Sequence, residues 1–140
     1  MNTDQPLSLA ALRGKVVAIF AFQMLCPGCV KMSIPQAQMA HEIFSGDDVA
    51  VIGLHSVFEH HEAMGRKSLE AFVHEYGLTF PIAIDKPGKN NAMPQTMELY
   101  VMQGTPTLLL IDRKGRLCKQ KFGHENDIVL GAEIMSLIRD

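Results

Sequence analysis

The sequence has few of the features that mark disulfide-stapled or nucleic-acid-binding proteins. Its 140 residues include three cysteines and no tryptophan, and 13 Lys and Arg stand against 15 Asp and Glu, a net charge of −2. Three cysteines are too few for a disulfide framework. A balanced charge without a basic run leaves no electrostatic footprint for nucleic acid or anionic membrane. We therefore expect neither as a partner.

Long apolar runs are also missing. The longest, Val16–Phe22, is far shorter than the roughly 20 residues that span a bilayer. The first residues show neither the basic nor the apolar region of a secretory signal. The sequence therefore predicts a cytoplasmic protein without a membrane span, or a periplasmic one if a leader has been removed.

The hydrophobic content is nevertheless sufficient for a core. With 47% hydrophobic residues, a chain of this length can bury most of its apolar surface in one compact domain. No repeat, linker or low-complexity tract divides it. We expect a single domain over residues 1–140, and a monomer.

The first half of the chain reads as a strand, helix and strand. Val16–Phe22 and Val49–Leu54 are apolar on both faces, which is typical of strands in the middle of a sheet covered on both sides. Between them, apolar residues recur at helical spacing from Pro27 to about Phe44. Pro35 interrupts this helix, and we expect it to bend the helix rather than end it. The two strands should be parallel, with a right-handed crossover.

An inserted helix and strand follow. Ser68 is the predicted N-cap of a helix Leu69–Tyr76, which Gly77 should end. Pro81–Ile84 reads as a short strand. Pro94 is predicted to open another helix, which continues to about Val101.

The last third reads as a hairpin and a helix. Strands Thr107–Ile111 and Arg116–Phe122 flank a tight turn, Asp112–Gly115. The final segment, Asp127–Ile138, is predicted to pack on the sheet through apolar residues at helical spacing: Ile128, Ala132, Met135 and Ile138. The order of elements predicts an α/β fold, in which helices cover both faces of a mixed sheet.

The strongest chemical signal is Cys26-Pro27-Gly28-Cys29, directly after a buried strand and at the start of a helix. A thiol at a helix N-terminus faces unpaired backbone N–H groups, which stabilise a thiolate. The spacing lets the second thiol reach the first across one helical turn. We assign Cys26 as the attacking nucleophile and Cys29 as the buried resolving thiol. A zinc site is the weaker interpretation, because a second CxxC or a suitably spaced histidine pair is missing.

Four motifs in the same order resemble the thioredoxin-like proteins of the TlpA/ResA type, within the redoxin (AhpC/TSA) group. They are Leu12–Val17, Cys26–Cys29, Tyr76–Pro81, and Gly104–Thr107 followed by 110–115. The resemblance implies a thioredoxin-like three-layer α/β/α sandwich with an αβ insert between the second core strand and the second core helix. It also implies a thiol–disulfide oxidoreductase that requires no organic cofactor, since two thiols carry both electrons.

The resemblance also implies a substrate site. In this family the proline that matches Pro106 is cis and lies against the CxxC motif, which leaves the backbone at Thr105 free to pair with an extended substrate. Pro27, Gly28, Thr105 and Pro106 are the expected substrate-binding residues. The expected partners are a protein disulfide and an electron donor.

Three positions depart from the family pattern. Phe20 replaces the buried carboxylate that serves the resolving cysteine, Met32 replaces a glutamate, and Leu25 replaces an aromatic residue. The proton acceptor for Cys29 is therefore unassigned from the sequence.

A thiol peroxidase of the peroxiredoxin type is the main alternative, because it shares the fold. Such enzymes need a Pro-x-x-x-Thr/Ser-x-x-Cys loop. With Cys29 as the peroxidatic residue, Phe22 would occupy the proline position and Cys26 the threonine position. The peroxidase alternative is therefore supported only by the shared fold and not by the sequence motif.

A redox-sensing or metal-handling module is the non-enzymatic alternative. The segment His55–Glu62 holds three histidines and two glutamates, but no spacing within it is diagnostic of a metal site. His124 follows the last strand, unlike the histidine of copper-delivering Sco-type relatives. We read the segment as a solvated polar loop.

Two features of the last strand complete the predictions. Cys118 is expected to be a small buried hydrophobic residue, and Lys119 and Lys121, on the opposite face, are expected to be exposed.

Overall fold

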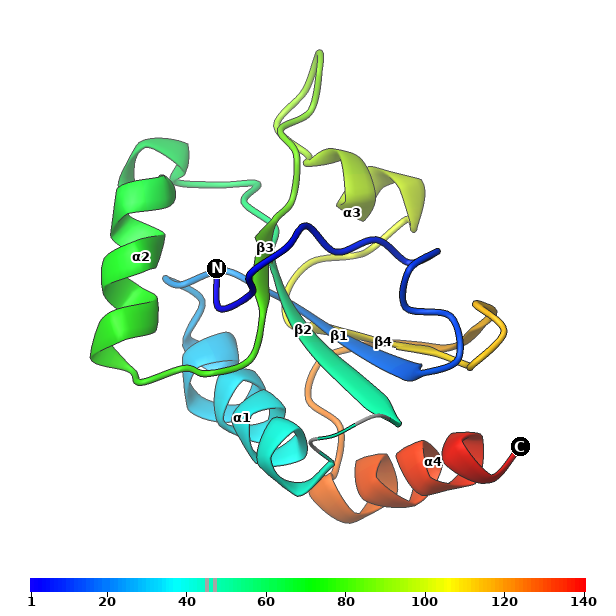
Figure 1. Ribbon diagram of the computed structural model, residues 1–140. Helices are drawn as coiled ribbons and strands as arrows, with labels where there is room; N and C mark the ends of the chain where they lie inside the picture. Colours follow the sequence, from blue (N-terminus) through cyan, green and yellow to red (C-terminus); the bar gives the residue numbers. More distant parts are fainter. Residues whose placement is uncertain (45, 47) are drawn as a thin grey trace.

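The fold is a five-stranded mixed sheet with helices on both faces, seen in a computed structural model that describes residues 1–44, 46 and 48–140 (Figure 1). The strands are β1 (Val16–Phe22), β2 (Val49–His55), β3 (Ile82–Ile84), β4 (Thr107–Ile111) and β5 (Leu117–Phe122). The helices are α1 (Ile34–Ile43), α2 (Arg66–Glu75), α3 (Gln95–Leu99) and α4 (Asp127–Arg139), with a π-helical turn at Cys29–Ser33 and a 3-10 turn at His61–Ala63. The α/β mixed-sheet prediction is confirmed.

The sheet is built around β1. Its order is β3-β2-β1-β4-β5, in which β1 pairs in parallel with β2 and antiparallel with β4. Every residue of β1 is buried, as its unbroken apolar sequence predicts for a central strand. Because β1 and β2 are parallel, their carboxyl ends meet at one edge of the sheet, with Phe22 opposite His55.

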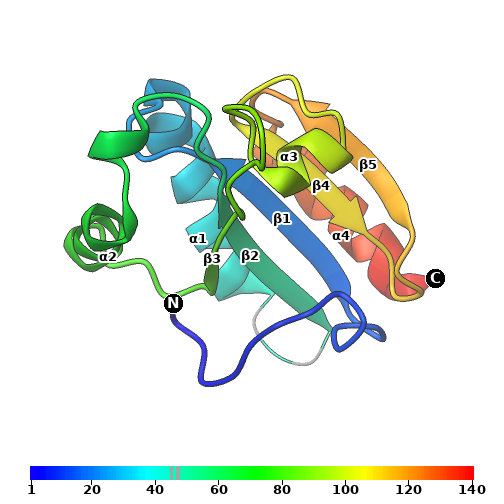
Figure 2. The same cartoon turned by 90° about the horizontal axis from the view of Figure 1, so that it is seen from above.

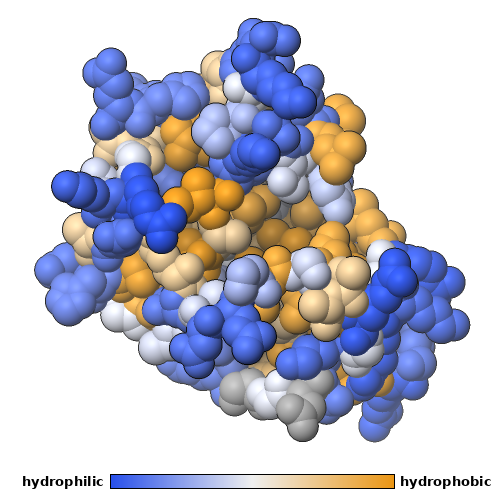
Figure 3. Space-filling view, turned by 45° about the horizontal axis from the view of Figure 1, so that its top comes forward, coloured by the Kyte–Doolittle hydropathy of each residue, from blue (hydrophilic) through white to orange (hydrophobic). Residues whose placement is uncertain are grey.

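Each face of the sheet has its own core. On one face α1 and α4 pack against β1 and β4, while α2 extends the same core beside β3 (Figure 2). The other face is covered more sparsely, by α3 and the N-terminal segment. A cleft of about 830 Å³ lies between them, and the space-filling view shows a hollow lined by hydrophobic residues on this side (Figure 3). The cleft lies apart from the cysteines, since its lining includes neither Cys26 nor Cys29.

Pro35 does not end its helix, as predicted, and it follows an irregular turn. The turn before it is widened, because Ile34 N–H donates to the carbonyl of Cys29, five residues earlier. Proline has no N–H to continue the ladder with Lys31, so the irregular turn absorbs the break before α1 begins.

The predicted start of α2 is wrong. The helix begins at Arg66 with Gly65 as its N-cap, and Ser68 lies inside the first turn. The amide of Leu69 already donates to the carbonyl of Gly65 at 3.0 Å, so the turn closes before Ser68 could cap it. The predicted end is confirmed, since Gly77 follows with φ +62°.

The predicted apolar face of α4 is wrong in part. Ile128 is 82% exposed, and Leu130 and Ile134 are the side chains buried in the core. Of the predicted residues, Ile138 does pack against that core. The helix carries apolar residues on several sides, so spacing alone did not select the buried stripe. Asn126 caps the helix by accepting from the amides of Ile128 and Val129.

On β5 the predictions for Cys118 and Lys119 are wrong, whereas the Lys121 side chain is 41% exposed. Cys118 is exposed rather than buried, and Lys119 is partly buried, with its ammonium between Glu125 and Glu133. β5 is an edge strand, and the face that carries Lys119 is the one turned toward α4. Cys118 does not share this face with Lys119, and it is exposed.

Candidate active site

The CxxC motif lies where the central strand passes into a helix. β1 ends at Phe22, and Pro27 and Gly28 form the first helical turn, with Gly28 in the right-handed helical region. Cys26 is partly exposed, whereas Cys29 is fully buried beneath the helix. The strand thus delivers the first thiol to the surface, and the helical turn places the second one inside.

The two sulfur atoms are in direct contact. The Cys29 thiol donates to Cys26 Sγ at 2.6 Å, and the Cys29 backbone N–H donates to the same sulfur at 3.3 Å. That amide belongs to the first turn of the helix, where N–H groups lack intrahelical partners. Negative charge on Cys26 would therefore be stabilised by the helix N-terminus.

The fold makes the buried thiol of Cys29 a weak acid. The pKa of Cys29 is raised from 9.0 to about 12, first because burial penalises the thiolate and second because the thiol donates to Cys26. Hydrogen bonds from the Gln23 backbone and the Thr105 hydroxyl oppose this rise. Phe20, which occupies the position of the family's carboxylate, is buried and apolar.

The loop before β4 closes over the cysteines. The Thr105–Pro106 peptide bond is cis, as the resemblance implies. Cys26 Sγ lies 3.7 Å from the Thr105 carbonyl, and a Cβ on Gly28 would lie 3.8 Å from Pro106 Cδ. The structure therefore brings the six predicted site residues together at one edge of the sheet: Cys26, Pro27, Gly28, Cys29, Thr105 and Pro106.

Two further polar residues lie under the site, where the sequence analysis did not place them. Gln23 is buried, and its amide donates to Thr105 Oγ1 at 3.2 Å and accepts from Phe58 N–H at 3.2 Å. His55 is buried as well, and its Nε2 accepts from Met24 N–H at 3.2 Å. The sequence signal for Gln23 is that it is the first polar residue after a wholly apolar strand, but its partners are distant in sequence.

The histidine-rich segment divides into two parts. Glu59, His60, His61 and Glu62 are exposed, so the prediction of a solvated loop is confirmed for them. It is wrong for His55, which ends β2 and whose pKa is lowered to about 4 by burial. Among residues 1–44, 46 and 48–140, no three of the His, Cys, Asp and Glu side chains gather in an arrangement that could hold a metal ion.

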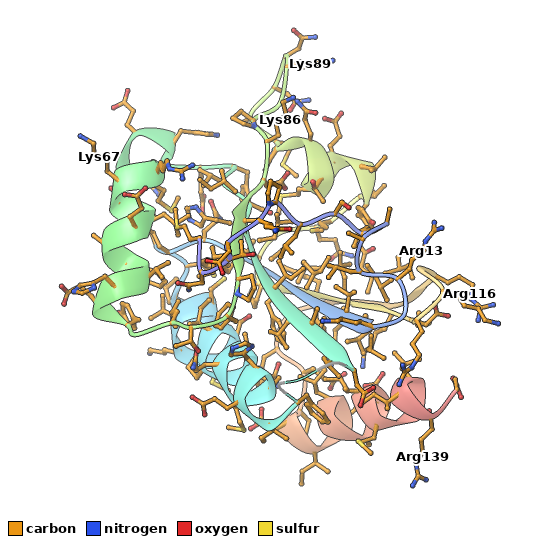
Figure 4. The ribbon with its side chains drawn as sticks, in the orientation of Figure 1. Arg13, Lys67, Lys86, Lys89, Arg116 and Arg139 are labelled. Atoms are coloured by element: carbon orange, nitrogen blue, oxygen red, sulfur yellow. The ribbon has the colours of Figure 1, made fainter. Side chains whose placement is uncertain are left out.

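The basic side chains labelled in Figure 4 come from different parts of the chain. Five of them extend outward at the periphery of the molecule: Arg13, Lys67, Lys89, Arg116 and Arg139. Within the described part of the chain, no helix has the length and apolar character needed to cross a membrane.

A dithiol at a helix N-terminus, beneath a cis-proline loop on a mixed sheet, defines a thioredoxin-like domain. The chain belongs to the Redoxin family, whose sequence profile matches residues 1–133.

Solved structures agree with this assignment. A crystal structure of a thioredoxin-like superfamily protein superimposes with a TM-score of 0.97 at 55% identity, covering 100% of this chain and 90% of that one. A thiol–disulfide isomerase from Corynebacterium glutamicum gives 0.94 at 48% identity, covering 97% and 88%.

Curated relatives are more distant and longer. The sporulation thiol–disulfide oxidoreductase A of Bacillus subtilis is 27% identical over 111 residues, which cover 79% of this chain and 61% of that protein. The protein DipZ of Mycobacterium bovis is 30% identical over 148 aligned positions, covering 100% of this chain and 19% of its own length.

Proposed function

We propose that this protein exchanges disulfides with protein substrates through Cys26 and Cys29. The proposal depends on one observation: two thiols in direct contact differ in exposure, with Cys26 at the surface and Cys29 buried. A substrate can reach Cys26 but not Cys29, so the two have separate tasks.

The reaction runs in two displacements. The Cys26 thiolate attacks one sulfur of a substrate disulfide, and the other substrate sulfur leaves as a thiolate. Cys29 then attacks Cys26, the Cys26–substrate bond breaks, and the second substrate sulfur leaves. The substrate gains two electrons, and the pair ends as a Cys26–Cys29 disulfide that an electron donor must reduce.

The substrate chain is proposed to lie across the cis-proline loop. Pro27 and Gly28 are exposed beside Pro106, so a backbone can approach Cys26 without meeting a bulky side chain. Thr105 and Pro106 would hold that backbone next to the reacting sulfur. We propose that residues 1–140 form one domain and that the protein acts as a monomer. The cytoplasmic location stays a prediction from the sequence.

The reduction potential of the Cys26–Cys29 pair tests the proposal. The protein is equilibrated in graded thiol/disulfide buffers and its free thiols are counted, with Cys118→Ser as the background because Cys118 is exposed. We expect a reversible two-electron couple nearer the roughly −270 mV of thioredoxin than the roughly −120 mV of DsbA. If no intramolecular disulfide forms at any potential, the proposal fails.

A variant pair localises the chemistry. Cys26→Ser should abolish reduction of a model disulfide, whereas Cys118→Ser should leave the rate unchanged. A Cys26→Ser protein that still reduced the disulfide at the wild-type rate would contradict the assignment of the nucleophile.

A further inference from the structure

A second cavity, of about 450 Å³, lies between the start of α2 and the loop that follows β3 (Figure 1). Its lining includes His55 at the end of β2, together with Gly65 and Arg66 at the start of α2. Neither Cys26 nor Cys29 lines it. The cavity is therefore separate from the dithiol, and its volume is in the range of pockets that bind small molecules.

His55 offers this cavity a hydrogen-bond donor. A backbone N–H can only donate, so the Nε2 that receives Met24 N–H at 3.2 Å carries no hydrogen. Because burial lowers the pKa of His55 to about 4, the ring is neutral near pH 7 and its one N–H is at Nδ1.

The Nδ1 atom of His55 has no hydrogen-bond partner among the described residues. The residue as a whole is 1% exposed. Even so, Nδ1 is not sealed in the core, since the one fully enclosed side-chain N or O atom that lacks a partner in the described chain belongs to His124. The Nδ1–H of His55 therefore meets open space, and the cavity that His55 lines supplies it.

The start of α2 adds further donors to the same cavity. Gly65 is the N-cap, so no side chain caps the helix, and the first turn holds no acidic residue. Amides of a first turn lack intrahelical partners, and a helix N-terminus favours negative charge. A Cβ on Gly65 would have nothing within 4 Å, so the backbone here faces open space as well.

The charged side chains of the cavity leave donors in excess. Asp85, the one acidic residue among the described lining, accepts from Ser56 Oγ at 2.9 Å and from the Thr96 amide at 2.8 Å. Its carboxylate is thus satisfied by donors of its own. Arg66 uses Nε to bind Glu70 at 3.1 Å, which leaves its other guanidinium N–H groups for a ligand.

Much of the remaining wall is apolar. Val57, Met64, Leu69 and Ile84 contribute to it, and Met64 and Leu69 are buried side chains. An inorganic anion would gain nothing from this wall, whereas an apolar group would be removed from water against it. The donors and the wall together fit a molecule that is anionic at one end and apolar at the other.

We propose that this cavity binds a small organic carboxylate. The carboxylate accepts from His55 Nδ1–H, from the amides at the start of α2 and from Arg66, while the apolar part packs on Met64 and Leu69. The inference goes beyond the proposed exchange function and does not rest on it, because the two displacements at the cysteines use none of these groups.

Benzoate is a suitable probe, and calorimetric titration at pH 7 tests the proposal. We expect one saturable site, with neutral benzamide and inorganic phosphate each bound at least tenfold more weakly. Gly65→Asp supplies the missing N-cap and places a carboxylate of the chain at the site, so it should abolish benzoate binding in a folded protein. His55→Phe keeps a ring but removes Nδ1–H, and it should weaken binding about tenfold, as for one lost hydrogen bond to a charged group.

A matched pair of variants separates the site from net charge. Arg66→Met should weaken benzoate binding roughly threefold, the effect of a partly exposed charge. Lys67→Met removes the same charge from the next residue, whose side chain extends outward at the periphery (Figure 4) and does not line the cavity. It should bind benzoate like the wild-type protein.

Several outcomes would overturn the site. They are the absence of saturable benzoate binding, equal affinity for benzoate and benzamide, or an unchanged affinity in Gly65→Asp. Phosphate that binds as tightly as benzoate would overturn the assigned ligand class. If His55→Phe does not fold, Gly65→Asp decides the result, since aspartate is a favourable N-cap. Cys26→Ser should bind benzoate normally while it cannot exchange disulfides, so failure of the site and failure of the exchange function are seen separately.

Discussion

His55 is an ionisable residue that the fold keeps neutral. Its ring lies against Phe22 with centroids 5.1 Å apart, and its Nε2 accepts from Met24 N–H. A protonated ring would lose this acceptor and would carry charge into the core. The same residue thus holds the strand that leads to Cys26 and makes that arrangement sensitive to acid.

Mild acid should therefore destabilise the protein through His55. The pKa of His55 is about 4 in the folded state against 6.5 ordinarily, so between these values the unfolded chain binds more protons and stability rises with pH. We expect a loss of about 2 kcal/mol between pH 7 and pH 5, measured by urea unfolding. His55→Phe keeps a ring beside Phe22 and should show a flatter dependence. An identical dependence in both proteins would disprove the assignment.

At the residue scale the sequence predicts the reacting thiols but not the buried polar residues that contact the site. Cys26, Cys29 and Pro106 are recognisable from a local motif or from resemblance. Gln23 acts on Thr105, 82 residues away, and no local pattern records that contact. Cys118 was misjudged for a related reason, because the exposure of an edge strand depends on which helix lies over it.

At the element scale, β2 passes close to two aromatic rings. A Cβ on Gly53 would lie 2.9 Å from Phe80 and 3.2 Å from Phe22, and both rings are fully buried. Neither ring can move aside without disturbing the core.

Gly53→Ala should therefore lower the free energy of unfolding, by about 1–3 kcal/mol. Gly131 in α4 has nothing within 4 Å of an added Cβ, so Gly131→Ala should be neutral or stabilising because alanine favours helix. Denaturant midpoints of the two variants check the prediction, and equal shifts of the same sign would contradict it.

The ion cluster of Lys119 joins β5 to α4. Its ammonium bonds to Glu125, whose side chain is 8% exposed, and lies 2.6 Å from Glu133. Lys121 approaches the same Glu125 carboxylate at 3.3 Å. The pKa of Glu125 is lowered to about 2, first by the hydrogen bond from Lys119.

Lys119→Met should lower stability by about 1–2 kcal/mol, because Glu125 is left partly unpaired in a buried position. The exposed pair Arg66–Glu70 provides the comparison, and Arg66→Met should cost less than about 0.5 kcal/mol. Chemical unfolding at pH 7 measures both. A Lys119→Met effect as small as that of Arg66→Met would show that burial does not strengthen the cluster.

At the element scale the sequence predicts strands better than helix details. β1 and β4 match the predicted ranges because a short apolar run between turn residues has one plausible place, the middle of a sheet. α4 is apolar on several sides, so the choice of buried face depends on α1 and the sheet. The start of α2 depends on the backbone of Gly65, which no side-chain pattern records.

Across the whole molecule, the site and a structural clamp occupy opposite ends of β1. Arg113 donates to the carbonyls of Gly14 at 3.0 Å and Ile138 at 2.9 Å, and to Asp48 at 3.2 Å. It thereby ties the entry to β1, the end of α4 and the entry to β2. The cysteines lie beyond the far end of the same strand.

Stability and disulfide exchange should therefore be separable. Arg113→Met is expected to lower the free energy of unfolding by about 1–2 kcal/mol through lost hydrogen bonds. The rate at which Cys26 attacks a model disulfide should stay unchanged. Unfolding and single-turnover rates are measured on the same preparation. A loss of exchange activity at a temperature where the variant is folded would show that the two ends are coupled.

The position of Thr105, 79 residues after Cys26, has a consequence for how the protein is made. Ribosomes deliver the N-terminal part first, so β1, both thiols and β2 leave the exit tunnel before the cis-proline loop and β4 exist. During this interval the thiol that ends at 0% exposure has no cover on one side. The nascent chain therefore exposes a vicinal dithiol to oxidants until β4 has left the tunnel and paired with β1.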